Sequence, residues 1–392
     1  MLTSAYATLM SLEDLEGQRP GRAPLAPRRR ALGFYRCGAG SLQGHDLATR
    51  VEVARQLALV LGCRFSGGVV SAAELPEGAY VVPSDTLTSI EEARRLGITG
   101  PEDLFGGVVP HPFVATKLVT HPLVSRRAAA PAHWVHELGH ELGASVLPGY
   151  SVFGRDDAIE AACRLLPAGP VRLKDAGGVG GAGQWVAATL HELTARLDTL
   201  GPDRLAGGFV VERNLARVQT CSVGQVRAGR WLATYAGHQR LVRNHRGHEV
   251  YGGSTLSVVE GDFDELARLD LSPQMRLAIE QARQYHRTVH EAFPQMIASR
   301  CNYDVAQGHD TAGRWVSGVL EQSWRIGGCS GAEVAALRAF KERGAHAVQA
   351  STHEVYGDVA LPPGAVVLFD GHDAQAGGRI VKYALVHAHV DA

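Results

Sequence analysis

The segment VRLKDAGGVGGAG (171–183) is the sequence feature that most restricts what this chain can fold into. A short apolar strand is predicted to end in Lys174, and five glycines follow within seven positions: Gly177, Gly178, Gly180, Gly181 and Gly183. Glycine lets a loop expose its backbone N–H groups to a polyphosphate, and the lysine adds a positive charge for the same phosphates. In a P-loop the lysine instead follows the glycines. The segment is therefore either a phosphate-binding loop of another kind or an ordinary glycine-rich turn, and a helix is expected after it.

Regular elements are predicted on both sides of this loop. Upstream, residues 146–174 have the pattern of a strand, a helix and a second strand that ends in Lys174. Downstream, GGFVVERNL (207–215) is predicted to be an apolar strand that ends in Glu212.

Two acidic residues are predicted to meet further along the chain. Residues 301–328 have the pattern of two strands joined by a turn at GHDTAGR, with Asp304 in the first strand and Glu321 at the end of the second. If the strands pair as a hairpin, the two carboxylates converge. Mg²⁺ bound to a nucleotide takes oxygen ligands and bridges phosphates, so a carboxylate pair beside a phosphate-binding loop suits this ion. Arg325 follows closely and is placed to neutralise a transferring phosphoryl group.

In this order and spacing, these residues resemble the ATP-grasp superfamily, and in particular its glutathione synthetase-type domains, which hold ATP between two α+β subdomains. Lys117, in HPFVATKLVTHPLV, matches the first ATP-contacting lysine of that superfamily, and Lys174 matches the second. LEQSWRIGG (320–328) resembles its late Glu-x-Asn-x-Arg element, with Ser323 at the Asn position. Several phrases also resemble a bacterial branch of the superfamily that has no assigned substrate.

The resemblance implies a role for each matched position. The loop 177–183 corresponds to the loop that closes over the phosphates, and Glu212 corresponds to the acid at the adenine hinge, with the backbone of Asn214 and Leu215 facing the base. The implied site residues are, for ATP, Lys117, Lys174, Gly177, Gly178, Gly180, Gly181, Gly183, Glu212, Asn214 and Leu215; for Mg²⁺, Asp304, Glu321 and Ser323; and for catalysis, Arg325 and Lys174.

The implied fold is α+β, an ATP-grasp-like fold of two subdomains preceded by a small α/β domain. We expect a flexible segment at 1–30, because it is rich in Pro and Arg and has no apolar periodicity. The leading domain is expected at 31–110, where strands and a helix alternate, and the ATP-grasp-like domain at 111–392.

The activity that the resemblance implies is ATP- and Mg²⁺-dependent ligation. A small-molecule carboxylate is activated as an acyl phosphate and then attacked by an amine or a similar nucleophile. Kinase-like phosphoryl transfer on the same fold and a nucleotide-binding protein without turnover are alternatives.

HELGHELGAS (136–145) suggests a function of another class, because it contains His-Glu-x-x-His. On a helix, His136 and His140 share one face and can bind zinc, with Glu137 as the base of a metallopeptidase. The longer form of the motif requires a third histidine where Val146 stands. The alternative is a surface helix that connects the Lys117 region to the next strand.

Composition excludes some further classes. The net charge of −1 argues against a nucleic-acid partner, and no apolar run approaches the ~20 residues of a membrane span. The six cysteines form no C-x-x-C pair, and the N-terminus lacks a signal-peptide pattern, so a cytoplasmic protein with reduced thiols is expected. The polar stretch 235–253 is predicted to be a hairpin that either holds an anionic substrate through Arg240 and Arg243 or is a solvated turn. The sequence leaves the oligomeric state open.

Overall fold

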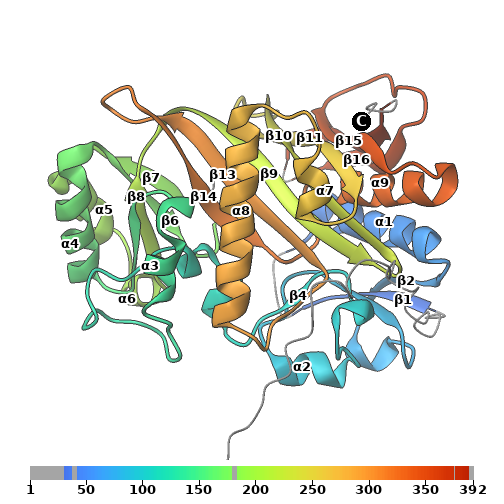
Figure 1. Ribbon diagram of the computed structural model, residues 1–392, viewed down its shortest axis with the longest axis horizontal. Helices are drawn as coiled ribbons and strands as arrows, with labels where there is room; N and C mark the ends of the chain where they lie inside the picture. Colours follow the sequence, from blue (N-terminus) through green and yellow to red (C-terminus); the bar gives the residue numbers. More distant parts are fainter. Residues whose placement is uncertain (1–30, 38–41, 179–182, 375, 388–392) are drawn as a thin grey trace, which may run out of the picture.

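The structure of the 392-residue chain is a computed structural model, and it describes residues 31–37, 42–178, 183–374 and 376–387. The expected flexible segment 1–30 lies outside these ranges. The described residues form four sheets with helices packed on them (Figure 1).

The first sheet is three-stranded and parallel, in the order β2–β1–β3. Its elements are β1 (Ala31–Tyr35), the crossover helix α1 (Gly44–Leu61), β2 (Arg64–Val70) and β3 (Tyr80–Pro83). β1, α1 and β3 were predicted, because their apolar residues are continuous or helically spaced. β2 was missed, since two glycines interrupt it and only Val70 among its residues is buried. The expected small α/β region is confirmed.

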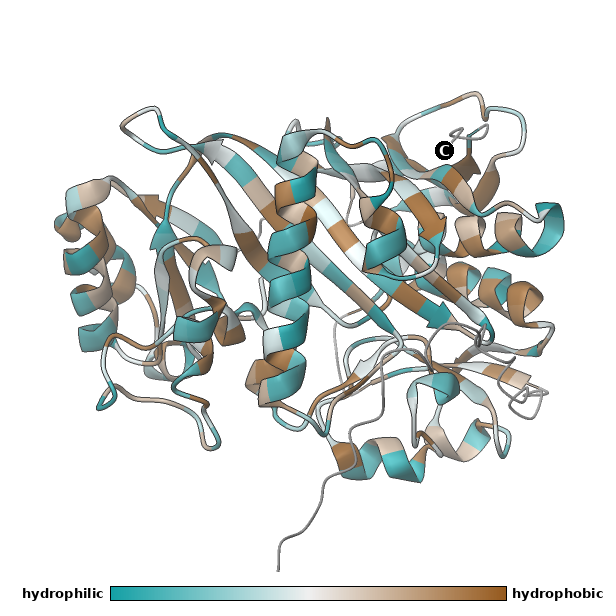
Figure 2. Cartoon of the chain, in the orientation of Figure 1, coloured by the Kyte–Doolittle hydropathy of each residue, from teal (hydrophilic) through white to brown (hydrophobic). Residues whose placement is uncertain are grey.

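The large sheet has eight strands in the order β14–β13–β9–β10–β11–β15–β17–β16, and every pairing within it is antiparallel. Its strands are β9 (Ala216–Ala228), β10 (Trp231–Arg243), β11 (Glu249–Glu260), β13 (Arg300–His309), β14 (Trp315–Ser323), β15 (Ala347–Tyr356), β16 (Val366–Asp373) and β17 (Gly378–Val386). Hydrophobic and hydrophilic residues succeed one another along these strands (Figure 2).

Helices cover both faces of the large sheet. Tyr235 and Ala236 are neighbours on β10, so they point to opposite faces, and each belongs to a different hydrophobic cluster. The Tyr235 cluster contains residues of α1 and α9 (Ser330–Arg343). The Ala236 cluster contains residues of α7 (Phe263–Ala267) and α8 (Pro273–Ala292), which lies across the front of the sheet in Figure 1.

A smaller antiparallel sheet, in the order β5–β8–β6–β7, forms the left part of Figure 1. Its strands are β5 (Gly149–Val152), β6 (Val171–Asp175), β7 (Gln184–Ala187) and β8 (Phe209–Arg213), and α4 (Arg155–Leu165), α5 (Leu190–Asp198) and α6 (Pro202–Ala206) accompany them. A helix was expected directly after the glycine-rich loop. That prediction was wrong by one element: β7 pairs with β6 first, and α5 follows.

The remaining elements connect these parts. They are α2 (Ile90–Arg95), α3 (Leu138–Leu142) and the antiparallel pair of β4 (Gly107–Val108) with β12 (Ile297–Ala298). The combination of a large antiparallel sheet, a smaller helix-covered sheet and a parallel leading sheet is the α+β architecture that the sequence predicted.

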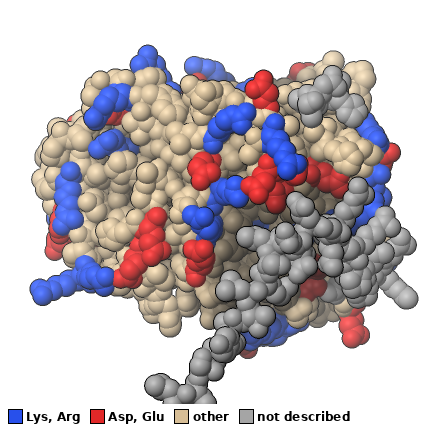
Figure 3. Space-filling view, in the orientation of Figure 1, with Lys and Arg blue, Asp and Glu red and all other residues tan. Residues whose placement is uncertain are grey.

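On the face seen in Figure 3, acidic and basic side chains lie side by side. None of the helices in the described ranges is both long enough and apolar enough to cross a membrane.

Candidate active site

The predicted acid pair lies on the hairpin of β13 and β14. The two strands pair in antiparallel register with Asp304 opposite Glu321 and Asn302 opposite Ser323, and the register shifts directly after Asp304. Residues opposite one another in an antiparallel pair point to the same face, so the two carboxylates share one side of the sheet.

Three neighbouring side chains donate hydrogen bonds to Asp304. Its Oδ1 accepts from Asn302 Nδ2 at 2.8 Å, Gln239 Nε2 at 2.8 Å and Ser222 Oγ at 3.4 Å. Among the described residues, none donates a hydrogen bond to Oδ2. Burial raises the pKa of Asp304 to about 6, and the charge of Glu321 acts in the same direction, against the bonds from Asn302 and Gln239. One oxygen of this carboxylate is therefore fixed, and the other remains available to a ligand.

Lys117 joins the acid pair to the glycine-rich loop. Its Nζ lies 2.9 Å from Glu321 Oε2 and donates to the backbone oxygens of Gly178 at 2.6 Å and Asp175 at 3.3 Å. The next residue of β14, Gln322, sets this distance, because its buried amide donates to the backbone oxygens of Val114 and Thr116, just before Lys117. The strand that carries Glu321 thus holds the turn that carries Lys117.

Lys174 lies on β6 and pairs with Glu212 on the neighbouring strand β8. Both side chains are almost fully buried, and His121 Nε2 lies 3.3 Å from the second carboxylate oxygen of Glu212. Burial alone would raise the pKa of Glu212, but Lys174 and His121 outweigh it and lower the pKa to about 2. Glu212 is therefore a buried anion that depends on Lys174.

The glycine-rich loop joins β6 to β7. Gly177, Gly178 and Gly183 are described, whereas Gly180 and Gly181 lie outside the described residues. At the base of the loop, Asp175 N donates to Gly183 O at 2.9 Å, and the side chain of Asp175 pairs with Arg204 of α6. Gly183 has φ +69°, and a Cβ there would lie 2.6 Å from the Asp175 carboxylate, so this position requires glycine.

The expected adenine-hinge residues follow β8. Asn214 Oδ1 accepts two hydrogen bonds from the guanidinium of Arg172, at 2.7 and 3.1 Å. Leu215 is buried against Leu147 and Ala306, where the small sheet meets the large one. Glu212, Asn214 and Leu215 thus lie at the junction of the two sheets.

Arg325 lies beyond the end of β14 and faces the leading sheet. Its Nε is 3.5 Å from Asp85, and its Nη1 donates to the backbone oxygen of Ile326 at 3.2 Å. A second arginine, Arg50 of α1, lies close enough for the charge of Arg325 to act on it. Arg50 Nη1 donates to Ser84 O at 2.7 Å, and no carboxylate among the described residues forms a salt bridge with it. Burial lowers the pKa of Arg50 to about 10, and the positive charge of Arg325 contributes. The charges of Asp46 and Asp85 act on the pKa of Arg50 in the opposite direction but do not outweigh burial, so the two guanidinium groups favour an anionic ligand.

Ser323 does not lie free beside the acid pair. Its hydroxyl and its backbone oxygen accept hydrogen bonds from Arg300 Nη1, at 3.3 and 3.2 Å. The side chain of Arg300 in turn pairs with Glu333 at 2.8 Å. Among the described residues, no arginine forms a salt bridge with the acid pair, since Glu321 pairs with Lys117 and Arg300 with Glu333.

The helix expected over HELGH is shorter than the zinc motif requires. α3 begins at Leu138, so His136 precedes it, and Glu137 pairs with Arg126 on the surface. Gly139 is buried, and a Cβ there would lie 2.2 Å from the backbone of Pro122, so the glycine in the motif serves close packing. In the described ranges, no group of three or more His, Cys, Asp or Glu side chains could hold a metal ion. The surface-helix interpretation was also incomplete, since α3 packs against the segment after Lys117.

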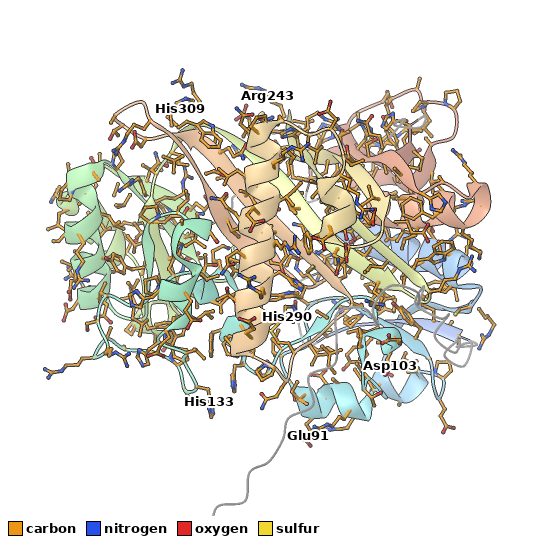
Figure 4. All side chains as sticks on the ribbon, viewed as in Figure 1. Glu91, Asp103, His133, Arg243, His290 and His309 are labelled. Carbon is orange, nitrogen blue, oxygen red and sulfur yellow. The ribbon has the colours of Figure 1, made fainter. Side chains whose placement is uncertain are left out.

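The polar hairpin predicted at 235–253 is formed by β10 and β11. Arg240 donates to Gly252 O at 2.7 Å and lies 3.1 Å from His353 Nδ1. Arg243 donates to Gly247 O at 3.3 Å within the turn, and Figure 4 shows it at the top edge of the molecule. Arg243 is therefore remote from the leading sheet that Arg325 faces.

Several residues of the site were missed in the sequence. They are the partners of the predicted residues: Ser222, Gln239 and Asn302 at Asp304, His121 at Glu212, Gln322 at the Lys117 turn, and Arg50 beside Arg325. Asn302 and Gln322 lie within two residues of a predicted site residue, so the strand pattern could have found them. Ser222 and Gln239 come from distant strands, Arg50 from α1, and His121 from the end of the short helical turn Lys117–Thr120, and no local signal marks them.

Comparison with known proteins gives a family and a fold. Residues 36–384 match the family described as "Protein of unknown function (DUF3182)". No curated protein matches the sequence significantly.

Among solved structures, ATP-grasp ligases share the fold at low identity. Phosphoribosylamine–glycine ligase of Thermotoga maritima is 14% identical, with a TM-score of 0.50 over 90% of this chain and 92% of its own. Biotin carboxylase of Campylobacter jejuni, solved as a β,γ-ATP complex, is 12% identical, with a TM-score of 0.52 over 91% and 87%. The biotin carboxylase domain of Hydrogenobacter thermophilus 2-oxoglutarate carboxylase, solved with MgADP, ADP and bicarbonate, is 11% identical, with a TM-score of 0.50 over 92% and 87%. The ATP-grasp fold predicted from the sequence is thereby confirmed.

Proposed function

Because this chain belongs to the DUF3182 family and has the fold of the ATP-grasp ligases, we propose that it is an ATP- and Mg²⁺-dependent ligase. It would activate a small-molecule carboxylate as an acyl phosphate, which an amine or a similar nucleophile then attacks. This is the activity that the sequence resemblance implies, with the substrate given as a chemical class.

The proposal assigns a role to each residue of the candidate site. Asp304 and Glu321 would hold Mg²⁺, and the Ser323 hydroxyl would become a further oxygen donor only after leaving Arg300 Nη1. Lys117, Lys174 and the glycine-rich loop would hold the phosphates, and the segment from Glu212 to Leu215 would face the adenine. When bound, ATP would supply the phosphoryl group, and Mg²⁺ would offset the negative charge of the phosphates.

One observation supports this proposal above the others. Glu321 lies opposite Asp304, and Lys117 links Glu321 to a backbone oxygen of the glycine-rich loop. Acid pair, lysine and loop come from three distant parts of the chain, so their approach is not a consequence of sequence proximity. Carboxylate oxygens are the ligands that Mg²⁺ prefers. Asp304 Oδ2 can serve as one, because it accepts no hydrogen bond from the described residues.

The two buried lysines would change partners when nucleotide binds. Lys117 and Lys174 are each neutralised by a glutamate in the structure, so neither is an unpaired buried charge. A phosphate group can replace a carboxylate as partner of Lys117, and this releases Glu321 toward the metal. Arg325, with Arg50 beside it, would hold the carboxylate of the acid substrate in reach of the phosphoryl group.

The double variant Asp304→Asn, Glu321→Gln tests the proposal, because it keeps size and hydrogen bonding but removes both charges. We expect Mg²⁺-dependent ATP binding and turnover to be lost, and thermal stability without ligand to fall, because the buried Lys117 loses its carboxylate partner. Thermal melts with and without Mg·ATP measure both. A variant that Mg·ATP stabilises as much as it stabilises wild type would contradict the metal site.

Product analysis separates ligation from kinase-like transfer. A ligase releases ADP and inorganic phosphate only when both the acid and the nucleophile are present. A kinase leaves the phosphate on its product.

A further inference from the structure

A fully buried ion pair lies directly behind the candidate metal site. Arg300, at the start of β13, is 2% exposed, and Glu333, in the first turn of α9, is 0% exposed. Arg300 Nη2 lies 2.8 Å from Glu333 Oε1, and Nε lies 3.2 Å from both carboxylate oxygens. Removing two charges from water is costly, and apolar residues of similar volume often stabilise a fold as well as such a pair does. Stability alone therefore does not explain why an ion pair, and not two apolar side chains, occupies this position.

One side of the pair holds the chain that leaves β14. Arg300 Nη1 donates to the backbone oxygens of Arg325 at 2.6 Å and Ser323 at 3.2 Å. These residues follow Glu321, so the guanidinium fixes the segment between the acid and the arginine of the candidate site.

The other side reaches Asp304 through two further side chains. The hydroxyl of Tyr235 lies 2.6 Å from Glu333 Oε1 and 3.0 Å from Asn302 Oδ1. With its Oδ1 toward this hydroxyl, Asn302 turns its Nδ2 toward Asp304 Oδ1, 2.8 Å away. All three links are buried, since Tyr235 is 0% and Asn302 is 6% exposed.

We propose that Arg300, Glu333, Tyr235 and Asn302 are positioning residues that orient the metal-binding carboxylate. Asn302 holds Asp304 Oδ1, so that Oδ2 is presented to Mg²⁺, while Arg300 holds the segment from Ser323 to Arg325. Asn302 stands directly opposite Ser323 in the strand register, so a carboxamide lies on β13 where the resemblance places one on β14. It acts through Asp304 and is not itself a ligand, because its Oδ1 faces Tyr235. This inference rests on the proposed function.

Asn302→Leu tests the link to Asp304, and Gln307→Leu is the matched control. Gln307 lies on the same strand, is equally buried at 5% exposed, and donates its amide to Gln274 O, away from Asp304. We expect Asn302→Leu to weaken Mg²⁺-dependent ATP binding by about tenfold or more, the effect of one charge-assisted hydrogen bond. ATP binding without Mg²⁺ should change in neither variant. Titration calorimetry with ATP, at several Mg²⁺ concentrations and with none, gives both affinities.

The double variant Arg300→Met, Glu333→Leu tests the ion pair while leaving no unpaired buried charge. If the ion pair serves only stability, the ATP affinity of the folded double variant should depend on Mg²⁺ as in wild type. If the pair positions the carboxylate, this dependence should be weakened as in Asn302→Leu.

The outcomes distinguish this inference from the function on which it rests. If wild type binds ATP with no dependence on Mg²⁺, the proposed function fails, and the inference fails with it. If wild type depends on Mg²⁺ and Asn302→Leu behaves like Gln307→Leu, the inference alone is overturned.

Discussion

At the scale of single residues, the charges of the site are nearly all committed to partners. Lys117 and Lys174 pair with glutamates, and Asp304 has one oxygen fixed by three donors. The exceptions are Asp304 Oδ2 and much of the guanidinium of Arg50. A ligand that adds negative charge at Arg50 and a cation at Asp304 would complete the site.

Lys174→Ala should weaken ATP binding at least tenfold, because a charge-assisted contact with phosphate contributes about 1.5–3 kcal/mol. The variant also leaves Glu212 as a buried anion without its lysine, so the free energy of unfolding should fall by about 3–5 kcal/mol. Calorimetric titration at a temperature where circular dichroism shows a folded variant measures the first effect, and denaturant unfolding measures the second. Equal ATP affinities would remove Lys174 from the site.

Arg50→Gln should weaken binding of the acid substrate about tenfold or more without changing Mg·ATP binding, since Arg50 lies beside Arg325 and away from the lysines. Arg55→Gln is the control, because Arg55 lies on the same helix but pairs with Glu52 on the surface. Small carboxylates that raise the melting temperature of the wild type serve as probes, and their affinity is measured in each variant. An equal loss of carboxylate affinity in Arg50→Gln and Arg55→Gln would indicate a general effect of removing a positive charge.

At the scale of elements, the sequence predicted the site best where one hairpin or one loop carries it. The turn GHDTAGR joins two strands of clear pattern, so Asp304 and Glu321 could be placed opposite one another in advance. β7 was missed because its four residues follow glycines and precede a longer helical pattern. Gln239 was missed because strand register, which no local signal encodes, brings it to Asp304, and His121 was missed because its partner Glu212 lies far away in the sequence.

His286 on α8 makes stability depend on pH. Burial lowers its pKa from 6.5 to about 3, and the adjacent His290 acts in the same direction; the ring also bonds to Tyr303 at 2.8 Å. Below pH 6.5 the unfolded chain binds a proton that the folded chain does not, so stability falls as the pH falls. Figure 4 shows His290 at the lower end of α8.

His286→Gln should remove this dependence at one position. Between pH 7 and pH 5 the variant should lose about 2 kcal/mol less free energy of unfolding than wild type does. Urea unfolding at both pH values measures the difference. Parallel losses in the two proteins would show that His286 is protonated in the folded state.

At the scale of the whole molecule, the leading α/β region and the end of the chain share one core. Leu57 and Val53 of α1 pack in the same cluster as Leu337 and Phe340 of α9, on the face of the large sheet opposite α8. The leading sheet therefore ends near residue 110, but its core does not. We propose that the two parts do not fold independently.

A fragment of residues 111–392 should therefore fail to fold as a stable unit, since it exposes the apolar faces that α1 covers.

In the full chain, Leu57→Ala, at 0% exposed, should lower the free energy of unfolding by about 2–5 kcal/mol. Circular dichroism and denaturant unfolding measure both. A fragment that unfolds cooperatively with wild-type Mg·ATP stabilisation would show that the leading region is dispensable.

The shared core of α1 and α9 also has a consequence for biosynthesis. α1 ends at Leu61 and α9 begins at Ser330, so about 270 residues are translated between them. At ~5–20 residues per second, the apolar face of α1 emerges from the ribosome roughly 15–50 seconds before the helix that covers it. During that interval the apolar face of α1 is exposed to chaperones and to other nascent chains on the same mRNA. Slow translation should therefore favour aggregation of this protein unless a chaperone binds the exposed helix.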